Sequence, residues 1–478
     1  MTARTSVIPG LALATCLAFA SPWSVQADEA PPWSEHAVKV HVDQSELRGV
    51  LSLGDLSSLI DKGRALFEAR FTSLDGAGRP HATQAIIPTA HRRPVEHDFQ
   101  RLAGPDANAC SSCHNEPRTG GAGGFVGNVF VSEGFESADF DTLDPQFSNE
   151  RGTNHLFGAG LVELLAREMT ADLQAARTTA LDEARRLGEP EKVALASKGV
   201  SFGSITALPD GSIDFAGLEG VDPDLVIRPF TQKGVMTSLR QFTVNALNQH
   251  HGMQPDERWG ARWTGTDDFD GDGHSNEISA GLVSAMVAFQ ASLPSPQEVE
   301  PDSAEWRKAA VRGREVFADL GCTNCHRPSL PLDSLGFSDP GPVDTAGTLR
   351  TGDVEAPAIY DLALLDWAKA LPRDAKGRVL VPLFGDLKRH RIADQRQAAF
   401  GNETLAQRFV ERDVFITSEL WGLADTAPYG HRGDMTTLDE AIRAHGGEAY
   451  EAGKAYAALA EKDRSALIAW LKTLRIGE

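Results

Sequence analysis

The chain has 478 residues, of which 46 are Lys or Arg and 67 are Asp or Glu, so its formal net charge is −21 at pH 7. This length exceeds that of one ordinary domain, and 41% hydrophobic with 24% charged residues describes a globular protein with enough apolar material for real cores. Fibrous and disordered chains are excluded, and so is nucleic acid as a partner, because the acidic sequence lacks the basic stripes that bind phosphate.

The first residues have the pattern of a secretory signal. Arg4 precedes an apolar run that ends in small residues before Asp28, which predicts a signal peptide over residues 1–27 and a periplasmic mature protein. The alternatives are a membrane anchor, for which the apolar run is too short, and a lipoprotein attached at Cys16, which Thr15 disfavours. No later stretch has the length and apolarity of a transmembrane helix.

Four further cysteines form two pairs, each followed directly by histidine: Cys110-Ser-Ser-Cys113-His114 and Cys322-Thr-Asn-Cys325-His326. A haem c needs two thiols one helical turn apart for its vinyl groups and an adjacent imidazole for its iron. Disulfides and a redox dithiol do not require the adjacent histidine. In a zinc site made of two cysteine pairs, the pairs lie within roughly 12 to 20 residues of each other, and the two pairs here are much farther apart. The sequence therefore predicts two covalently bound haem c groups, with His114 and His326 as iron ligands.

A repeated segment precedes each motif, KGRALF at 62–67 and RGREVF at 312–317. We interpret this as one helix-and-attachment-loop module used twice, with an insertion at 68–109 in the first copy. Three prolines between 294 and 301 forbid a continuous helix. The sequence thus predicts a mostly α fold with two cytochrome-c-like haem domains, an enlarged one at 28–295 and a compact one at 296–478. Helical patterns are strongest at 165–187, 236–250 and 276–293.

The segment DFDGDGHSNE at 268–277 is similar to a calcium-binding loop. Asp268, Asp270, Asp272 and Asn276 occupy positions 1, 3, 5 and 9 of such a loop, with glycine at position 6. Position 12 is Ser279 where a bidentate glutamate is expected, although Glu277 could substitute from position 10. Whether the segment binds calcium or is an acidic turn before the next helix stays open.

The two haem motifs and four further segments resemble the bacterial di-haem oxidoreductases related to di-haem cytochrome c peroxidases. The segments are RGTNHLFGAGLVELL, TSLRQFTVNALNQHHGM, VPLFGDLKRHRIAD and TAPYGHRGDMTTLDEAIRAHGGEA, which begin at residues 151, 237, 381 and 426. The resemblance implies that one haem collects electrons and that the other meets an oxidant such as peroxide. It also implies a small redox protein or a quinol-linked electron donor as partner.

The resemblance further implies a second ligand for the C-terminal iron. In the peroxidases a Met follows a Tyr-x-His-x-Gly motif, and the same spacing from His431 reaches His445 here. Thr437 and Glu440 match a capping box at the start of a short helix, which would fix the histidine in place. A bis-His haem generally has a lower potential than a His/Met haem.

The distal side of the N-terminal haem is less determined by the sequence. His251 is our first candidate, because it ends an amphipathic helix and its neighbour His250 points about 100° away; His155 and His390 are alternatives in family-like segments. Glu163 is the candidate acid for proton transfer. The alternative is that it lies on the solvent-facing side of its helix. The glutamate motif usual on the distal side of the peroxidases is not found.

The sequence therefore predicts an exported di-haem c-type oxidoreductase. Electrons would pass from the C-terminal haem to the N-terminal haem, which would reduce a small-molecule oxidant. Two alternatives stay open: a non-catalytic electron-transfer cytochrome, and an oxygen-activating enzyme that acts on an organic or protein substrate.

Overall fold

The computed structural model describes residues 34–78, 109–128, 150–345, 347–403, 407 and 409–477. The predicted signal peptide, Cys16 and most of the insertion at 68–109 lie outside these residues. The chain divides into two compact units, Met1–His36 and Ala37–Glu478. Every element described below belongs to the second unit.

The described residues form helices that range from single turns such as α2 to the 29-residue α3. They are α1 (Leu53–Glu68), α2 (Cys110–Cys113), α3 (Ala159–Leu187), α4 (Leu239–His251), α5 (Asp256–Trp259), α6 (Ala261–Thr264), α7 (Ala280–Ser292), α8 (Ala304–Asp319), α9 (Asp366–Lys369), α10 (Leu438–Arg443), α11 (Tyr450–Ala458) and α12 (Glu461–Leu471). The three predicted helices at 165–187, 236–250 and 276–293 are thus α3, α4 and α7, with shifted ends.

Short strands are more numerous than the predicted mostly α fold implies. They are β1 (Gly49–Val50), β2 (Gly123–Asn128), β3 (Glu150–Thr153), β4 (Glu191–Ser197), β5 (Val200–Ala207), β6 (Ile213–Asp214), β7 (Gln297–Glu298), β8 (Leu330–Leu332), β9 (Gly336–Asp339), β10 (Ala358–Asp361), β11 (Val379–Val381), β12 (Arg389–Arg391), β13 (Val414–Ile416) and β14 (Leu474–Arg475). The fold prediction is correct only in part, because these strands pair the long loops between helices. The sheets have the orders β1-β10-β9, β4-β5-β6, β2-β3, β8-β11, β12-β13 and β7-β14.

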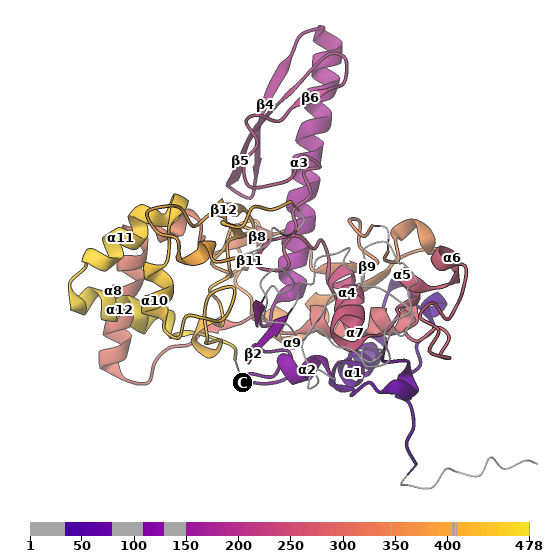
Figure 1. Cartoon of the computed structure of the whole chain (residues 1–478). Coiled ribbons are helices and arrows are strands. Elements are labelled where there is room, and N and C mark those ends of the chain that lie inside the picture. Colours follow the sequence, from indigo (N-terminus) through magenta and orange to yellow (C-terminus); the bar gives the residue numbers. More distant parts are fainter. Residues whose placement is uncertain are drawn as a thin grey trace, which may run out of the picture. The chain divides into compact units, whose positions relative to one another are not determined.

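Two close helix crossings repeat the same design. α1 packs on α7, and α8 packs on α12 (Figure 1). The glycines of the repeated segments, Gly63 and Gly313, lie at the contact points: a Cβ on Gly63 would overlap the backbone carbonyl of Ala285, and one on Gly313 would overlap that of Ala466. The repeated Gly-Arg segment is therefore explained by helix packing, since only glycine lets the two helices approach this closely.

The repeat extends to the aromatic residues beside each attachment motif. Phe67 of α1 lies 5.1 Å from Phe289 of α7 between ring centroids, and Phe317 of α8 lies 4.7 Å from Trp470 of α12. The same two phenylalanines contact the motif histidines, Phe67 with His114 at 6.0 Å and Phe317 with His326 at 6.3 Å. Each opening helix thus supplies one aromatic wall beside its attachment loop.

The main apolar core includes residues from both sides of the predicted domain boundary. Leu56, Leu165 and Met286 share it with Phe337 and Leu383. A second core contains the α8–α12 crossing. The boundary between residues 295 and 296 stays a prediction, and part of the C-terminal region packs with the N-terminal helices.

Candidate haem-binding sites

The N-terminal attachment motif forms one helical turn, as two thiols for one porphyrin require. α2 carries Cys110 and Cys113, and His114 caps its end. The His114 Nδ1–H donates to the carbonyl of Gly121 at 3.3 Å, which leaves Nε2 for a metal. Burial lowers the pKa of His114, and this favours the neutral imidazole that binds iron. Gly123 passes so close to α2 that a Cβ there would overlap the carbonyl of Cys113.

The C-terminal motif has the same construction. The 3-10 turn Cys322–Asn324 carries the first thiol, and the His326 Nδ1–H donates to the carbonyl of Phe384 at 3.1 Å. Burial, with a smaller contribution from His445, lowers the pKa of His326 to about 4. His326 is therefore neutral at pH 7.

The thiols do not fit the alternative uses of paired cysteines. All four are free, so neither motif forms a disulfide. Burial raises the pKa of Cys110 to about 12 and that of Cys322 to about 11. A redox dithiol needs a thiolate near neutral pH, and the raised pKa values of Cys110 and Cys322 do not favour that use.

His445 lies opposite His326, where the resemblance implies a second ligand. The capping box of Thr437 and Glu440 forms at the start of α10 as predicted. The His445 Nδ1–H donates to the carbonyl of Ala441 at 2.8 Å. The ring centroids of His326 and His445 are 6.4 Å apart, with an interplanar angle of 63°.

This spacing fits two imidazoles on one iron. An iron–nitrogen bond of about 2 Å and a ring centroid about 1.1 Å beyond the nitrogen give centroids roughly 6.2 Å apart. Both Nδ1 atoms are held by backbone carbonyls, so both Nε2 atoms are available for a metal between the rings. The residues present therefore fit a bis-His haem at this site.

The structure places His251 at the attachment edge of the N-terminal motif. It ends α4, is 4% exposed, and its Nε2 lies 3.5 Å from Cys110 Sγ. His250 is less buried, and its ring is turned 71° from that of His251. Of the two histidines, His251 is therefore the one that lies beside the N-terminal attachment motif. Its role as a distal group stays a prediction.

Glu163 does not lie in the same site as His251. It lies at the opposite end of α4, which spans 13 residues or about 20 Å at about 1.5 Å per residue. Its carboxylate accepts from Arg167 Nη2 at 2.5 Å and from the amide of Leu239, the first residue of α4, at 2.7 Å. Burial raises its pKa to about 7 against the effect of Arg167. These contacts indicate a clamp between α3 and α4.

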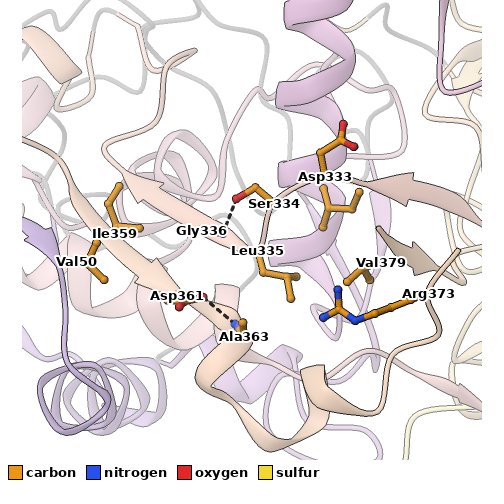
Figure 2. Close-up of a pocket in the computed structure, with 11 residues that line it drawn as sticks. Val50, Asp333, Ser334, Leu335, Gly336, Ile359, Asp361, Ala363, Arg373 and Val379 are labelled. Carbon is orange, nitrogen blue, oxygen red and sulfur yellow. Dashed lines mark hydrogen bonds between the residues drawn. The ribbon is translucent and has the colours of Figure 1, made fainter. Parts of the chain in front are cut away.

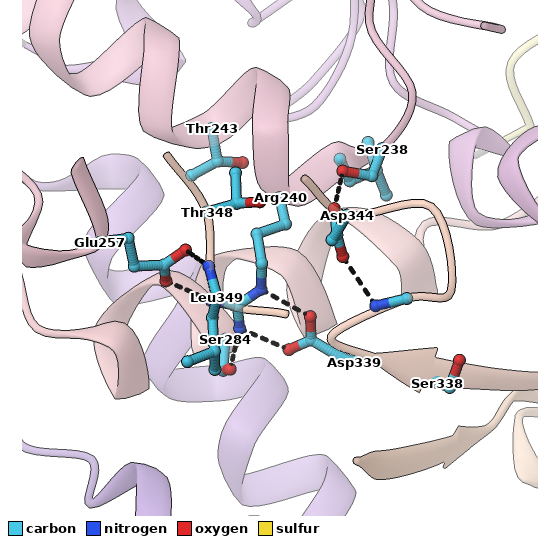
Figure 3. Close-up of polar contacts among 12 residues, drawn as sticks. Ser238, Arg240, Thr243, Glu257, Ser284, Ser338, Asp339, Asp344, Thr348 and Leu349 are labelled. Atoms are coloured by element: carbon cyan, nitrogen blue, oxygen red, sulfur yellow. Dashed lines mark hydrogen bonds and ion pairs between the residues drawn. The ribbon is translucent and has the colours of Figure 1, made fainter. Parts of the chain in front are cut away.

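A buried polar network holds the same end of α4 (Figure 3). Arg240 forms a bidentate ion pair with Asp339 of β9, at 2.8 and 2.9 Å, and also pairs with Glu257. Ser238 caps α4 and donates to Asp344. The network fixes α4, and with it the position of His251. No local pattern in the sequence predicts this network, because its members come from segments far apart in the chain.

The alternative histidines have other partners. The His155 Nε2–H donates to the carbonyl of Trp421 at 3.1 Å, and burial lowers its pKa to about 4. His390 bridges Asp386 at 2.9 Å and Glu448 at 2.8 Å, and lies 3.9 Å from Cys325 Sγ. His390 thus lies beside the C-terminal motif, which sequence reasoning did not predict.

His431, from which the spacing to His445 is counted, lies in a buried ionic cluster. Its ring is 3.7 Å from the carboxylate of Glu403, which also pairs with Lys233 at 3.1 Å and with Arg151. Phe400 contacts both His431 and His445, at 6.1 and 5.5 Å between centroids. The cluster therefore lies behind the second haem ligand.

Two further features lie apart from the haem motifs. A pocket of about 390 Å³ is lined by β9, β10 and their neighbours, including Asp361 and Arg373, and none of the predicted site residues lines it (Figure 2). The acidic loop places carboxylate oxygens of Asp268, Asp270 and Asp272 within 4.8 Å of one another. Asn276 is exposed, with a positive φ of 54°.

Among the described residues, no helix combines the length and the apolarity needed to cross a membrane.

Comparisons with known proteins agree with the C-terminal assignment. Residues 391–474 match the family model described as "Di-haem oxidoreductase, putative peroxidase". This match confirms the resemblance to the di-haem oxidoreductases and supports an oxidoreductase that uses haem, without specifying the oxidant. No curated protein matches the chain in sequence.

Solved structures give weaker similarities. The hydrazine synthase of Kuenenia stuttgartiensis, pressurised with xenon, is 12% identical with a TM-score of 0.35, covering 92% of this chain and 100% of that chain. A MauG-like protein associated with microbial copper homeostasis is 15% identical with a TM-score of 0.28, covering 66% and 88% of the two chains. At these TM-scores neither similarity establishes a shared fold.

Proposed function

From the match of residues 391–474 to the di-haem oxidoreductases, we propose that this chain is an exported oxidoreductase with two covalently attached haem c groups. His326 and His445 would hold the C-terminal haem, which would supply a redox site for electrons from a small redox protein or a quinol-linked donor. His114 would hold the N-terminal haem, which would supply the iron for reduction of a small-molecule oxidant such as peroxide. Each haem supplies an iron that changes its charge by one electron.

The pairing of His326 with His445 carries this proposal. Two neutral imidazoles at bis-His spacing, each held by a backbone carbonyl, suit an iron that only exchanges electrons. The two imidazoles would hold the iron, which would supply one-electron exchange at this site. The ionic cluster behind His445 and the wall of Phe400 keep that ligand in place.

The N-terminal site supplies different residues for the chemical step. His114 offers its Nε2 from one side, and His251 holds a second imidazole beside Cys110. A histidine at this position can move a proton at Nε2 toward or away from a bound oxidant. Glu163, which is engaged at the far end of α4, orients that helix and is a positioning residue in this proposal.

The test uses purified protein that carries its haems, in the oxidised and the half-reduced state. Cyanide or peroxide should perturb the spectrum of one haem only, and peroxide should be consumed when a reduced donor is present. If neither state binds an exogenous ligand and peroxide is not consumed, the protein is an electron carrier. Ligand binding without peroxide turnover would instead support oxygen activation on another substrate.

A further inference from the structure

The loop between α6 and α7 concentrates negative charge around a buried point. One oxygen each from Asp268, Asp270 and Asp272 converges within 4.8 Å. Both oxygens of Asp268 accept backbone amides, from Gly271 at 2.8 Å and Gly273 at 3.1 Å. The backbone thus holds the loop in a shape in which the aspartates face one another despite their like charges.

Asp270 is the observation that points to a ligand. Its side chain is 0% exposed, and neither of its carboxylate oxygens has a hydrogen-bond partner. A buried carboxylate without a partner costs several kcal/mol, and here the nearest charges are two more aspartates. A positive ion between the three side chains would remove this penalty, since a carboxylate oxygen can accept an amide and bind a metal at the same time.

Glu277 adds a fourth carboxylate from the end of the loop. It is half-buried, and one of its oxygens, Oε2, accepts the amide of Gln254 at 2.7 Å. Burial raises the pKa of Glu277, and the charge of Asp270 raises it further.

We propose that this loop binds one calcium ion through Asp268, Asp270, Asp272 and Glu277. The donor set is all oxygen, which selects a hard cation over zinc, copper or iron. Calcium accepts six to eight oxygens in irregular geometry, and backbone carbonyls and water can complete its shell. Magnesium requires a near-ideal octahedron, for which a loop with four charged side chains is less suited.

The ion would also brace the segment that follows His251. Glu277 holds the amide of Gln254, the carbonyl of Ile278 accepts the amide of Asp256 at 3.0 Å, and Gly78 donates to the carbonyl of Gly252 at 3.2 Å. A Cβ on Gly76 would overlap Glu277. The cation loop therefore joins the start of α7, the turn after α4 and the segment at 76–78.

The experiment measures Ca²⁺ binding by the haem-loaded protein after removal of metals with a chelator. Calorimetry should give one Ca²⁺ per chain, and Ca²⁺ should raise the thermal midpoint and slow amide exchange at Gln254. Asp270→Asn, which keeps the shape and removes the charge, should weaken Ca²⁺ binding by at least about 10-fold. Asp267→Asn, an exposed neighbour in the same loop, is the matched control and should change affinity less than about 2-fold.

Three outcomes would overturn the site. They are absence of Ca²⁺ binding by stripped protein with intact haem spectra, equal affinity in Asp270→Asn, and binding of Mg²⁺ but not Ca²⁺. If Asp270→Asn does not fold, Asp272→Asn replaces it with the same expectation. The haem readouts are separate from these measurements, so failure of the cation site leaves the proposed redox function standing.

Discussion

The motif histidines share one local rule: each donates its Nδ1–H to a backbone carbonyl and keeps Nε2 for metal. The residue types and their spacing could be predicted, because attachment chemistry needs Cys, Cys and His in a fixed order. The acceptors could not, because the carbonyls of Gly121, Phe384 and Ala441 belong to residues with no chemical signature. The same limit applied to Glu163, for which the sequence left a pocket-facing and a solvent-facing position open, and whose partner, the amide of Leu239, depends on tertiary packing.

Replacement of His445 by alanine tests the second iron ligand. His445→Ala should convert one haem from low-spin to high-spin and leave the other unchanged, because only the C-terminal iron loses an imidazole. His445→Met should restore the low-spin state at a higher potential. Optical and electron paramagnetic resonance spectra report both, and His41→Ala, an exposed histidine, is the control. An unchanged spectrum in His445→Ala would place the ligand elsewhere.

The buried carboxylate of Glu163 predicts a pH dependence of stability. Burial raises its pKa from 4.5 to about 7, so between these values the native state holds a proton that the unfolded state has lost. The contribution of Glu163 to the free energy of unfolding should therefore fall as pH rises from 4.5 to 7, by about 3.5 kcal/mol at about 1.4 kcal/mol per pH unit. Urea unfolding of wild type and Glu163→Gln should show this difference in slope, and parallel curves would contradict it. Glu305→Gln, at an exposed carboxylate, should follow the wild type.

At the scale of elements, periodic helices were predictable and strands were not. α3 and α4 have apolar repeats and α7 is a continuous apolar run, which a window of sequence reveals. By contrast, β8 to β13 have three or four residues each and form only because distant loops meet. The pairing of α1 with α7 crosses more than 200 positions, so nothing local indicates it. The repeated glycine was the one trace of it in the sequence.

The helix crossings predict opposite effects of two glycine substitutions. Gly313→Ala should force α8 away from α12 and lower the free energy of unfolding by about 1–3 kcal/mol, because its Cβ would overlap the carbonyl of Ala466. Gly54→Ala, in the first turn of α1 with only one atom as near as 3.8 Å, should be neutral or stabilising by up to about 1 kcal/mol. Denaturant midpoints check both. Equal midpoints for Gly313→Ala and wild type would mean that the crossing is not this tight.

At the scale of the whole molecule, both modules have a helix crossing beside an attachment motif, but different elements surround it. In the C-terminal module, α8, α12, Phe384 and His445 lie around the attachment motif. The N-terminal module is joined to α3, α4 and the strands from β8 to β11 in one core. Buried ionic contacts lie near both modules, so the difference between them is the apolar core that the N-terminal module shares with α3, α4 and these strands.

The molecule as a whole should carry two haems that survive denaturation. Each motif has both thiols and the adjacent histidine in one turn, so protein from an export-competent host with haem-maturation machinery should retain two haems per chain after unfolding. Replacement of Cys322 and Cys325 by alanine should leave one haem. It should also destabilise the α8–α12 module, because a bound haem would no longer contribute apolar contacts near His326 and its neighbour Phe317. Mass spectrometry and the pyridine haemochrome spectrum measure the haem count, and a yield of one haem from the unchanged chain, or zinc in place of iron, would contradict the assignment of both motifs.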